Sequence, residues 1–147
     1  MALNTILAQL KTDMVNKIDP ANDYKTRPVV KHGIYSKSDL DGKFPCICFE
    51  VIDEEIASAL GKNKIMMYYY ITLYGYAKAD GVRNTNSIKT LAHDVLYFIF
   101  NADWTYTDDT WIDSKVTYFI STESDNVSMF EFTIRVKDQV VVSEIRE

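Results

Sequence analysis

The sequence predicts an α+β domain in which a largely antiparallel or mixed β-sheet is flanked by two main helices. Residues 2–17 and 85–100 repeat apolar side chains at helical spacing. Strand patterns occur instead at residues 44–52, 66–77 and 127–137, with shorter ones at 28–35 and 116–120. In the strand at 127–137 the side chains are expected to alternate, inward for Phe130, Phe132, Ile134 and Val136 and outward for Glu131, Thr133, Arg135 and Lys137. The expected order is therefore helix, two strands, loop, strand, helix and two strands.

The composition fits one globular domain that spans residues 1–147. Hydrophobic residues make up 47% and charged residues 25%, which argues against disorder. The net charge is −5 and no cluster of Lys and Arg occurs, so an autonomous DNA-binding protein is not expected. No signal-peptide pattern or long apolar run is present, so we expect no membrane partner and synthesis in a cytoplasm.

Both helices have an apolar stripe. In the first helix the stripe consists of Leu3, Ile6, Leu7, Leu10 and Met14, and Pro20 ends the helix. In the second helix the stripe consists of Ile88, Leu91, Ala92, Val95 and Ile99. Its apolar surface is widened near the end by Leu96, Tyr97, Phe98 and Phe100. We expect a second helix or a second subunit to cover this extra width.

The strand at residues 66–77 has two faces of different character, because successive side chains of a strand alternate. One face carries Met67, Tyr69, Ile71 and Leu73, which we expect to pack under the helices. The other carries, around Thr72, the residues Tyr68, Tyr70, Tyr74 and Tyr76. Tyrosine buries a large area and keeps a polar group, so this face is a candidate subunit interface. An ordinary aromatic-rich core is the alternative interpretation.

Residues 53–65 interrupt the sheet with an acidic segment that ends in Gly61-Lys-Asn-Lys64. They could form a short helix capped by Gly61 or the tip of a hairpin. Their position between two strong strands favours a long projecting hairpin, and projecting loops often contact partners. The candidate contact residues of this loop are Glu54, Glu55, Lys62 and Lys64. Residues 138–147 are expected to form a short tail.

No motif predicts catalysis, and we expect no catalytic residue, cofactor or metal ion. His93 and Asp94 are adjacent and diverge around a helix, which favours a solvated helix face. The acidic groups at 53–55 and 108–109 lack the ligand spacing of a calcium loop and are expected to be solvated loops.

Two further groups of residues are expected to be structural. Cys46 and Cys48 point the same way from a strand, so we expect buried thiols without a disulfide or a zinc ion. An aromatic segment follows the second helix and contains Trp104, Tyr106 and Trp111. Without a basic groove beside it, a structural or interface role is favoured over stacking on nucleic-acid bases.

The strand Phe44-Pro-Cys-Ile-Cys-Phe-Glu-Val51, the loop after it and the long strand ending Tyr74-Gly-Tyr-Ala-Lys78 resemble a known pattern. They are similar to the middle of tail terminator (tail completion) proteins of long-tailed bacteriophages. The helix with Thr90-Leu-Ala-His-Asp-Val-Leu96 and the two late strands continue the resemblance, which covers most of the chain as a pattern of elements. The tyrosine run and the segment Trp104–Trp111 depart from it.

The resemblance implies a structural virion protein and not an enzyme. Such proteins form a ring, typically a hexamer, that caps the head-proximal end of the tail tube and stops its polymerisation. The ring also presents a surface to the head–tail connector or head completion protein. It implies assembly in the host cytoplasm, a final place in the tail or neck of the virion, and DNA that passes through the lumen without specific binding. An acidic protein would suit this passage because it repels phosphates.

Three alternatives stay open. One is another ring of the phage neck, such as a head completion, stopper or connector protein. A second is a non-catalytic adaptor or immunity-type domain that uses the tyrosine face for a single partner. The third is a small enzyme. A six-fold ring would favour the neck proteins, a monomer would favour the adaptor, and turnover of a substrate would favour the enzyme.

Overall fold

The computed structural model describes residues 3–33, 43–61, 63–79, 86–100, 111–112, 115–121 and 126–143, which form the predicted α+β fold. Within these ranges, a six-stranded mixed sheet is built mainly from β2 (Cys46–Ala59), β3 (Lys64–Lys78) and β6 (Val127–Val141). β3 lies between β2 and β6 and is antiparallel to both. Three short strands complete the sheet: β1 (Val29–His32) is parallel to β2, and β4 (Trp111–Ile112) and β5 (Thr117–Phe119) are antiparallel to β6.

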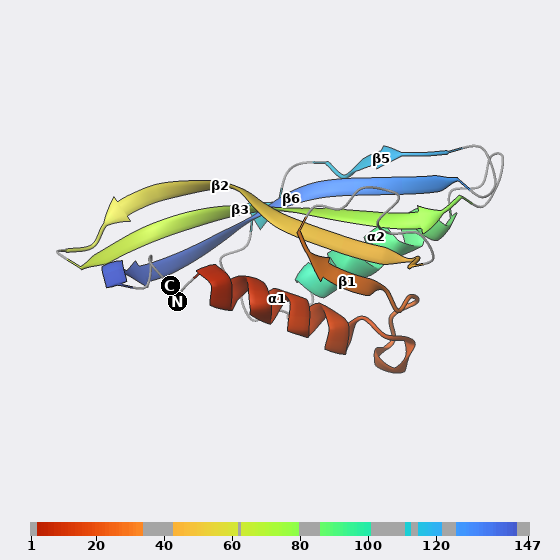
Figure 1. The fold of residues 1–147 in the computed structure, drawn as a ribbon, viewed down its shortest axis with the longest axis horizontal. Coiled ribbons are helices and arrows are strands. Elements are labelled where there is room, and N and C mark those ends of the chain that lie inside the picture. Colours follow the sequence, from red (N-terminus) through yellow and green to blue (C-terminus); the bar gives the residue numbers. More distant parts are fainter. Residues whose placement is uncertain are drawn as a thin grey trace.

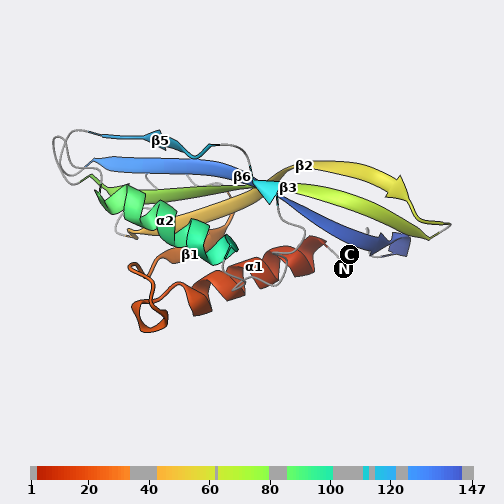
Figure 2. The same cartoon turned by 180° about the vertical axis from the view of Figure 1, so that it is seen from behind.

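Two helices, α1 (Leu3–Lys17) and α2 (Asn86–Phe100), cover one face of the sheet (Figures 1 and 2). They bury the predicted stripes, and the core face of β3 lies under them with Tyr69, Ile71 and Leu73 at most 3% exposed. β6 contributes every second residue to the same core, namely Phe130, Phe132, Ile134 and Val136. The extra apolar width of α2 is covered only in part, because Tyr97 is 50% and Phe100 is 59% exposed.

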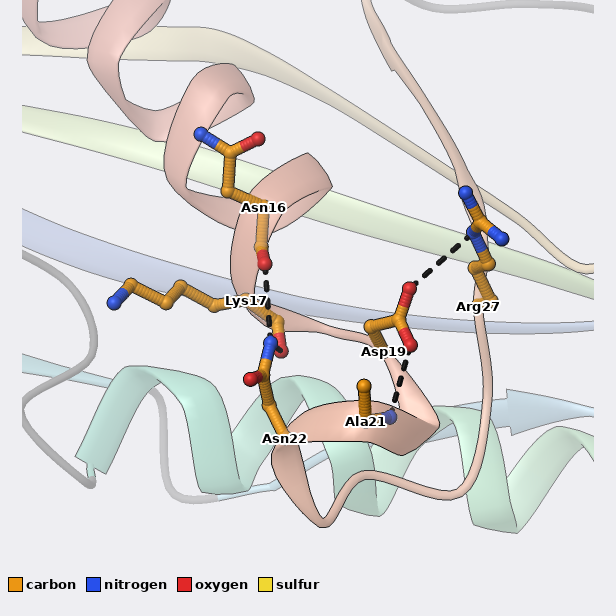
Figure 3. A network of polar contacts seen from close by, with 6 residues as sticks. All are labelled: Asn16, Lys17, Asp19, Ala21, Asn22 and Arg27. Atoms are coloured by element: carbon orange, nitrogen blue, oxygen red, sulfur yellow. Dashed lines mark hydrogen bonds and ion pairs between the residues drawn. The ribbon is translucent and has the colours of Figure 1, made fainter.

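A short 3-10 turn, η1 (Pro20–Asn22), redirects the chain after α1 (Figure 3). The side chain of Asp19 accepts a hydrogen bond from the backbone N–H of Ala21 at 2.9 Å, and its other oxygen lies 3.4 Å from Nε of Arg27. The Asn22 amide donates to two carbonyl oxygens that end α1, those of Asn16 and Lys17. These contacts satisfy backbone groups that a helix end leaves without partners.

The long strands continue past the N-terminal end of α1 as a three-stranded arm (Figure 1). The arm consists of residues 53–59 of β2, 64–70 of β3 and 135–141 of β6. The predicted projecting hairpin is confirmed, because β2 and β3 are antiparallel neighbours as far as Ala59 and Ile65. The predicted loop at residues 53–65 is wrong over most of its length, because β2 runs to Ala59 and β3 begins at Lys64. A bulge between Val51 and Asp53 shifts the register and lets the acidic segment pair with β3 despite its low strand propensity.

One close approach between strands requires a glycine. Gly75 of β3 is paired with Phe130 of β6, whose fully buried ring lies over it. A Cβ atom at Gly75 would overlap that ring. Because the ring is enclosed by the core, it has little room to move aside.

We expect Gly75→Ala to lower the free energy of unfolding by about 1–3 kcal/mol, the usual cost of overpacking a core. Chemical denaturation of the purified variant measures this change. In a Phe130→Leu background the overlap is removed, so the double variant should lose less than the sum of the two single losses. A Gly75→Ala protein as stable as the wild type would show that the ring does not enclose Gly75.

Candidate assembly surface

The face of the sheet opposite α1 and α2 (Figures 1 and 2) is called the open face below, and it carries four of the tyrosines of β3. Tyr68, Tyr70, Tyr74 and Tyr76 are all half-buried along it. Thr72, at the centre of the row, is 5% exposed, and its hydroxyl oxygen lies 2.8 Å from that of Thr133. The predicted difference between the two faces of β3 is therefore confirmed. The use of the open face as a subunit interface stays a prediction.

Within the arm, each of the two tyrosines on the open face lies between an acidic residue of β2 and a basic residue of β6. The two sets are Asp53–Tyr70–Arg135 and Glu55–Tyr68–Lys137. The Tyr70 hydroxyl donates a hydrogen bond to Oε2 of Glu55 at 2.7 Å. The Arg135 guanidinium lies 4.2 Å from the centre of the Tyr68 ring, a cation–π distance. These contacts link the three strands and orient both rings.

At the other end of the open face, Tyr74 and Tyr76 pack beside two buried thiols and Phe44. The thiols of Cys46 and Cys48 are free and fully buried, with 3.9 Å between their sulfur atoms. The contact with Cys46, together with burial, raises the pKa of the Cys48 thiol and keeps it protonated. The prediction of buried structural cysteines without a disulfide is confirmed.

Three tyrosine hydroxyl groups of this face, those of Tyr70, Tyr74 and Tyr76, are held in the neutral form. The hydrogen bond to Glu55 raises the pKa of Tyr70, because the bond requires the phenolic proton. Burial raises the pKa of Tyr74 and of Tyr76. At neutral pH the tyrosines therefore present apolar rings with uncharged polar ends, a combination that is favoured where one protein covers another.

A hollow of about 500 Å³ opens on the same face. It is lined by Ile52, Thr72, Tyr74, Lys115, Thr117, Glu131, Phe132 and Thr133. Its walls come from the central strands and from the segment that leads into β5. A concave site whose walls combine hydroxyl, charged, aliphatic and aromatic side chains is a place where a side chain of a bound protein can insert.

The charged residues predicted to form a contact loop lie mainly in strands. Glu54 and Glu55 are exposed residues of β2, and Lys64 is the first residue of β3. Lys62 lies outside the described residues. Because strand pairing replaces the expected loop, these charges belong to the arm. The alternation of β6 already indicated that Arg135 and Lys137 face outward, but their register opposite Tyr70 and Tyr68 required the structure.

The predicted solvated helix face at His93 and Asp94 is wrong for Asp94, although His93 is exposed. The Asp94 side chain is 6% exposed and accepts hydrogen bonds from the backbone N–H groups of Lys25 and Thr26 and from the Thr26 hydroxyl. Asp94 therefore ties α2 to the segment after α1. The sequence carries no local sign of this contact, because its partners are 68 and 69 residues away.

The described residues contain no group of three or more His, Cys, Asp and Glu side chains that could hold a metal ion. Of the aromatic segment, Trp111 lies in β4, and Trp104 and Tyr106 fall outside the described residues. The acidic residues 53–55 lie in β2, whereas 108–109 are also outside the described ranges. Neither described helix is long and apolar enough to span a membrane.

Comparison with protein-family models finds no match to this chain. Comparison with curated proteins finds none either. The fold and the open face define the chain as an α+β protein with a three-stranded arm and an aromatic sheet face.

We expect Asp94→Asn to lower the free energy of unfolding by about 1–3 kcal/mol, because a charged acceptor of several hydrogen bonds is replaced by a neutral amide. Chemical denaturation measures the change. Asp23→Asn is the matched control: Asp23 is exposed and Asn tolerates its positive φ of 68°, so the same substitution should alter stability by no more than about 0.5 kcal/mol. Equal effects of the two substitutions would contradict the anchoring role of Asp94.

Proposed function

We propose that this chain is a structural subunit of the tail of a long-tailed bacteriophage, similar to tail terminators. In this proposal, copies of it form a ring, a hexamer, that caps the head-proximal end of the tail tube. The ring stops tube polymerisation and gives the head completion or connector protein a surface to bind. The observation that carries the proposal is the two-faced β3, whose second face presents half-buried tyrosines that lie outside the main core under the helices.

Three features of the monomer support an assembly role. The open face combines neutral tyrosines with a hollow of about 500 Å³, which suits contact with another protein surface. The arm extends past α1 and offers strand edges away from the core. Large apolar side chains also remain exposed on other elements, with Phe100 of α2 at 59% and Phe119 of β5 at 51%. Together these surfaces exceed what an isolated monomer needs.

In this proposal the partners are other copies of the chain, the tail tube protein and the protein that joins the head. DNA passes through the lumen without specific binding, and the chain performs no catalysis. The net charge of −5 supports the passage of DNA, because acidic surfaces repel phosphates. The protein would assemble in the host cytoplasm and end in the neck of the virion.

An adaptor that binds one partner is the second candidate function, and the hollow beside Tyr74 is the observation that favours it. Measurement of the native mass separates the two candidates. A stable ring supports the tail protein, and a monomer at all concentrations supports the adaptor. Adding the purified ring to polymerising tail tube subunits then separates a terminator from another neck ring, because only a terminator stops tube growth.

We expect Tyr74→Asp to dissociate the ring while the subunit stays folded, because the substitution places a charge on the open face. Native mass spectrometry measures the assembly, and circular dichroism measures the fold. Ala8→Asp is the matched control, since it introduces the same charge at an exposed position of α1, on the opposite side of the sheet. If Tyr74→Asp forms rings as readily as the control, the open face is not the subunit interface.

A further inference from the structure

The arm has two outer edges that pair with no other strand in the part of the chain that the structure describes. Among the described residues, β1 reaches only Cys46–Phe49 of β2, so none of them forms a strand beside the outer edge of residues 53–59. The described residues of β4 and β5 reach no further along β6 than Arg135, so no described strand lies beside the outer edge of 136–141 either. Such edges are templates for pairing with a strand of another molecule.

The two edges differ in charge on the open face. The β2 edge carries Asp53 and Glu55 there, and Glu54 on the other side of the strand is also exposed. The β6 edge begins beside Arg135 and carries Lys137 on the open face. Asp138 points to the helix side, where one of its carboxylate oxygens is buried. The open face is therefore acidic at one edge of the arm and basic at the other.

This charge pattern selects one kind of contact between copies. A two-fold contact between β2 edges would oppose acidic residues, and a two-fold contact between β6 edges would oppose basic ones. Like charges directly opposite each other on paired strands are destabilising. A head-to-tail contact, in which the β2 edge of one copy meets the β6 edge of the next, brings opposite charges together. Head-to-tail contacts are those that generate closed rings.

Strand direction and apolar residues are compatible with that contact. β2 and β6 are each antiparallel to β3, so they run in the same direction, and a β6–β2 junction between copies would be parallel. The chain already forms one parallel pair, between β1 and β2. On the β2 side, Ile52 is 48% and Ile56 is 68% exposed, and a neighbouring strand would cover apolar surface there.

We propose that the arm is the junction between subunits: the β2 edge of each copy pairs with the β6 edge of the next copy to continue one sheet around the ring. The occupant of each edge is a second copy of this chain. The inference rests on the proposed ring function. It adds to the contact through the open face a second contact, at the strand edges of the arm, with the direction and the charges that specify it.

The test uses two full-length variants with opposite changes. Asp53→Lys/Glu55→Lys makes both edges of the arm basic, and Lys137→Glu weakens the basic edge and adds an acidic group to it. Each variant alone should assemble at least about tenfold less well than the wild type, because like charges meet at every junction. An equimolar mixture should regain assembly, because each variant then supplies the edge that the other needs. Native mass spectrometry should show rings with equal numbers of the two chains.

The controls separate failure of this inference from failure of the ring function. Lys11→Glu, at an exposed position of α1, reverses a charge away from the arm and should assemble like the wild type. Circular dichroism checks the fold, and the milder Asp53→Asn/Glu55→Gln variant, which should assemble to an intermediate degree, replaces any variant that does not fold.

The remaining outcomes each overturn the inference. Variants that assemble like the wild type, or folded variants whose mixture stays dissociated, would reject the edge junction and leave the ring function standing. Variants that keep the ring but no longer bind tail tubes would show that the strand edges of the arm contact the tail tube and not a second copy. A wild-type protein that is monomeric at all concentrations would reject the junction and the ring function together.

Discussion

The fold depends on the pairing of β3 with β2 and β6 along nearly its whole length. Pairing on both sides fixes which side chains face the helices and which face outward. A slip of one residue would exchange the two faces and place the tyrosines in the core. Two features oppose such a slip: the ring of Phe130 fits only over a glycine, Gly75, and the bulge after Val51 sets the register of the acidic segment.

The two faces of the sheet formed by β2, β3 and β6 have different roles. On the helix side, apolar side chains form the main core, and hydrogen bonds to Asp94 connect α2 to the segment after α1. On the open side, neutral tyrosines, a hydroxyl pair and charged strand edges remain near the surface. Helix support for the outer part of the arm comes from a small cluster of Ile6, Tyr69 and Val140, whereas Val136 joins the main core. A three-stranded arm with little core beneath it gains stability when further strands extend the sheet.

Much of the fold follows from periodicity in the sequence. The alternation at Phe130–Val136 and Met67–Leu73 correctly predicted strands and core faces, because side-chain alternation is a local property. The acidic run at 53–55 was misassigned to a loop, because its strand state comes from pairing with β3 and not from its own propensity. Asp94 was misassigned because its hydrogen-bond donors are distant in sequence. The tyrosine face was predictable, whereas the acidic and basic residues beside it depend on register between strands.

The central claim is that the open face and the arm serve assembly into a ring. Electron microscopy of the purified full-length protein tests it most directly, because a ring and a monomer differ in shape as well as in mass. The account predicts closed rings of uniform diameter with a central opening, in which each subunit contacts two neighbours. Isolated elongated particles at every protein concentration would contradict it.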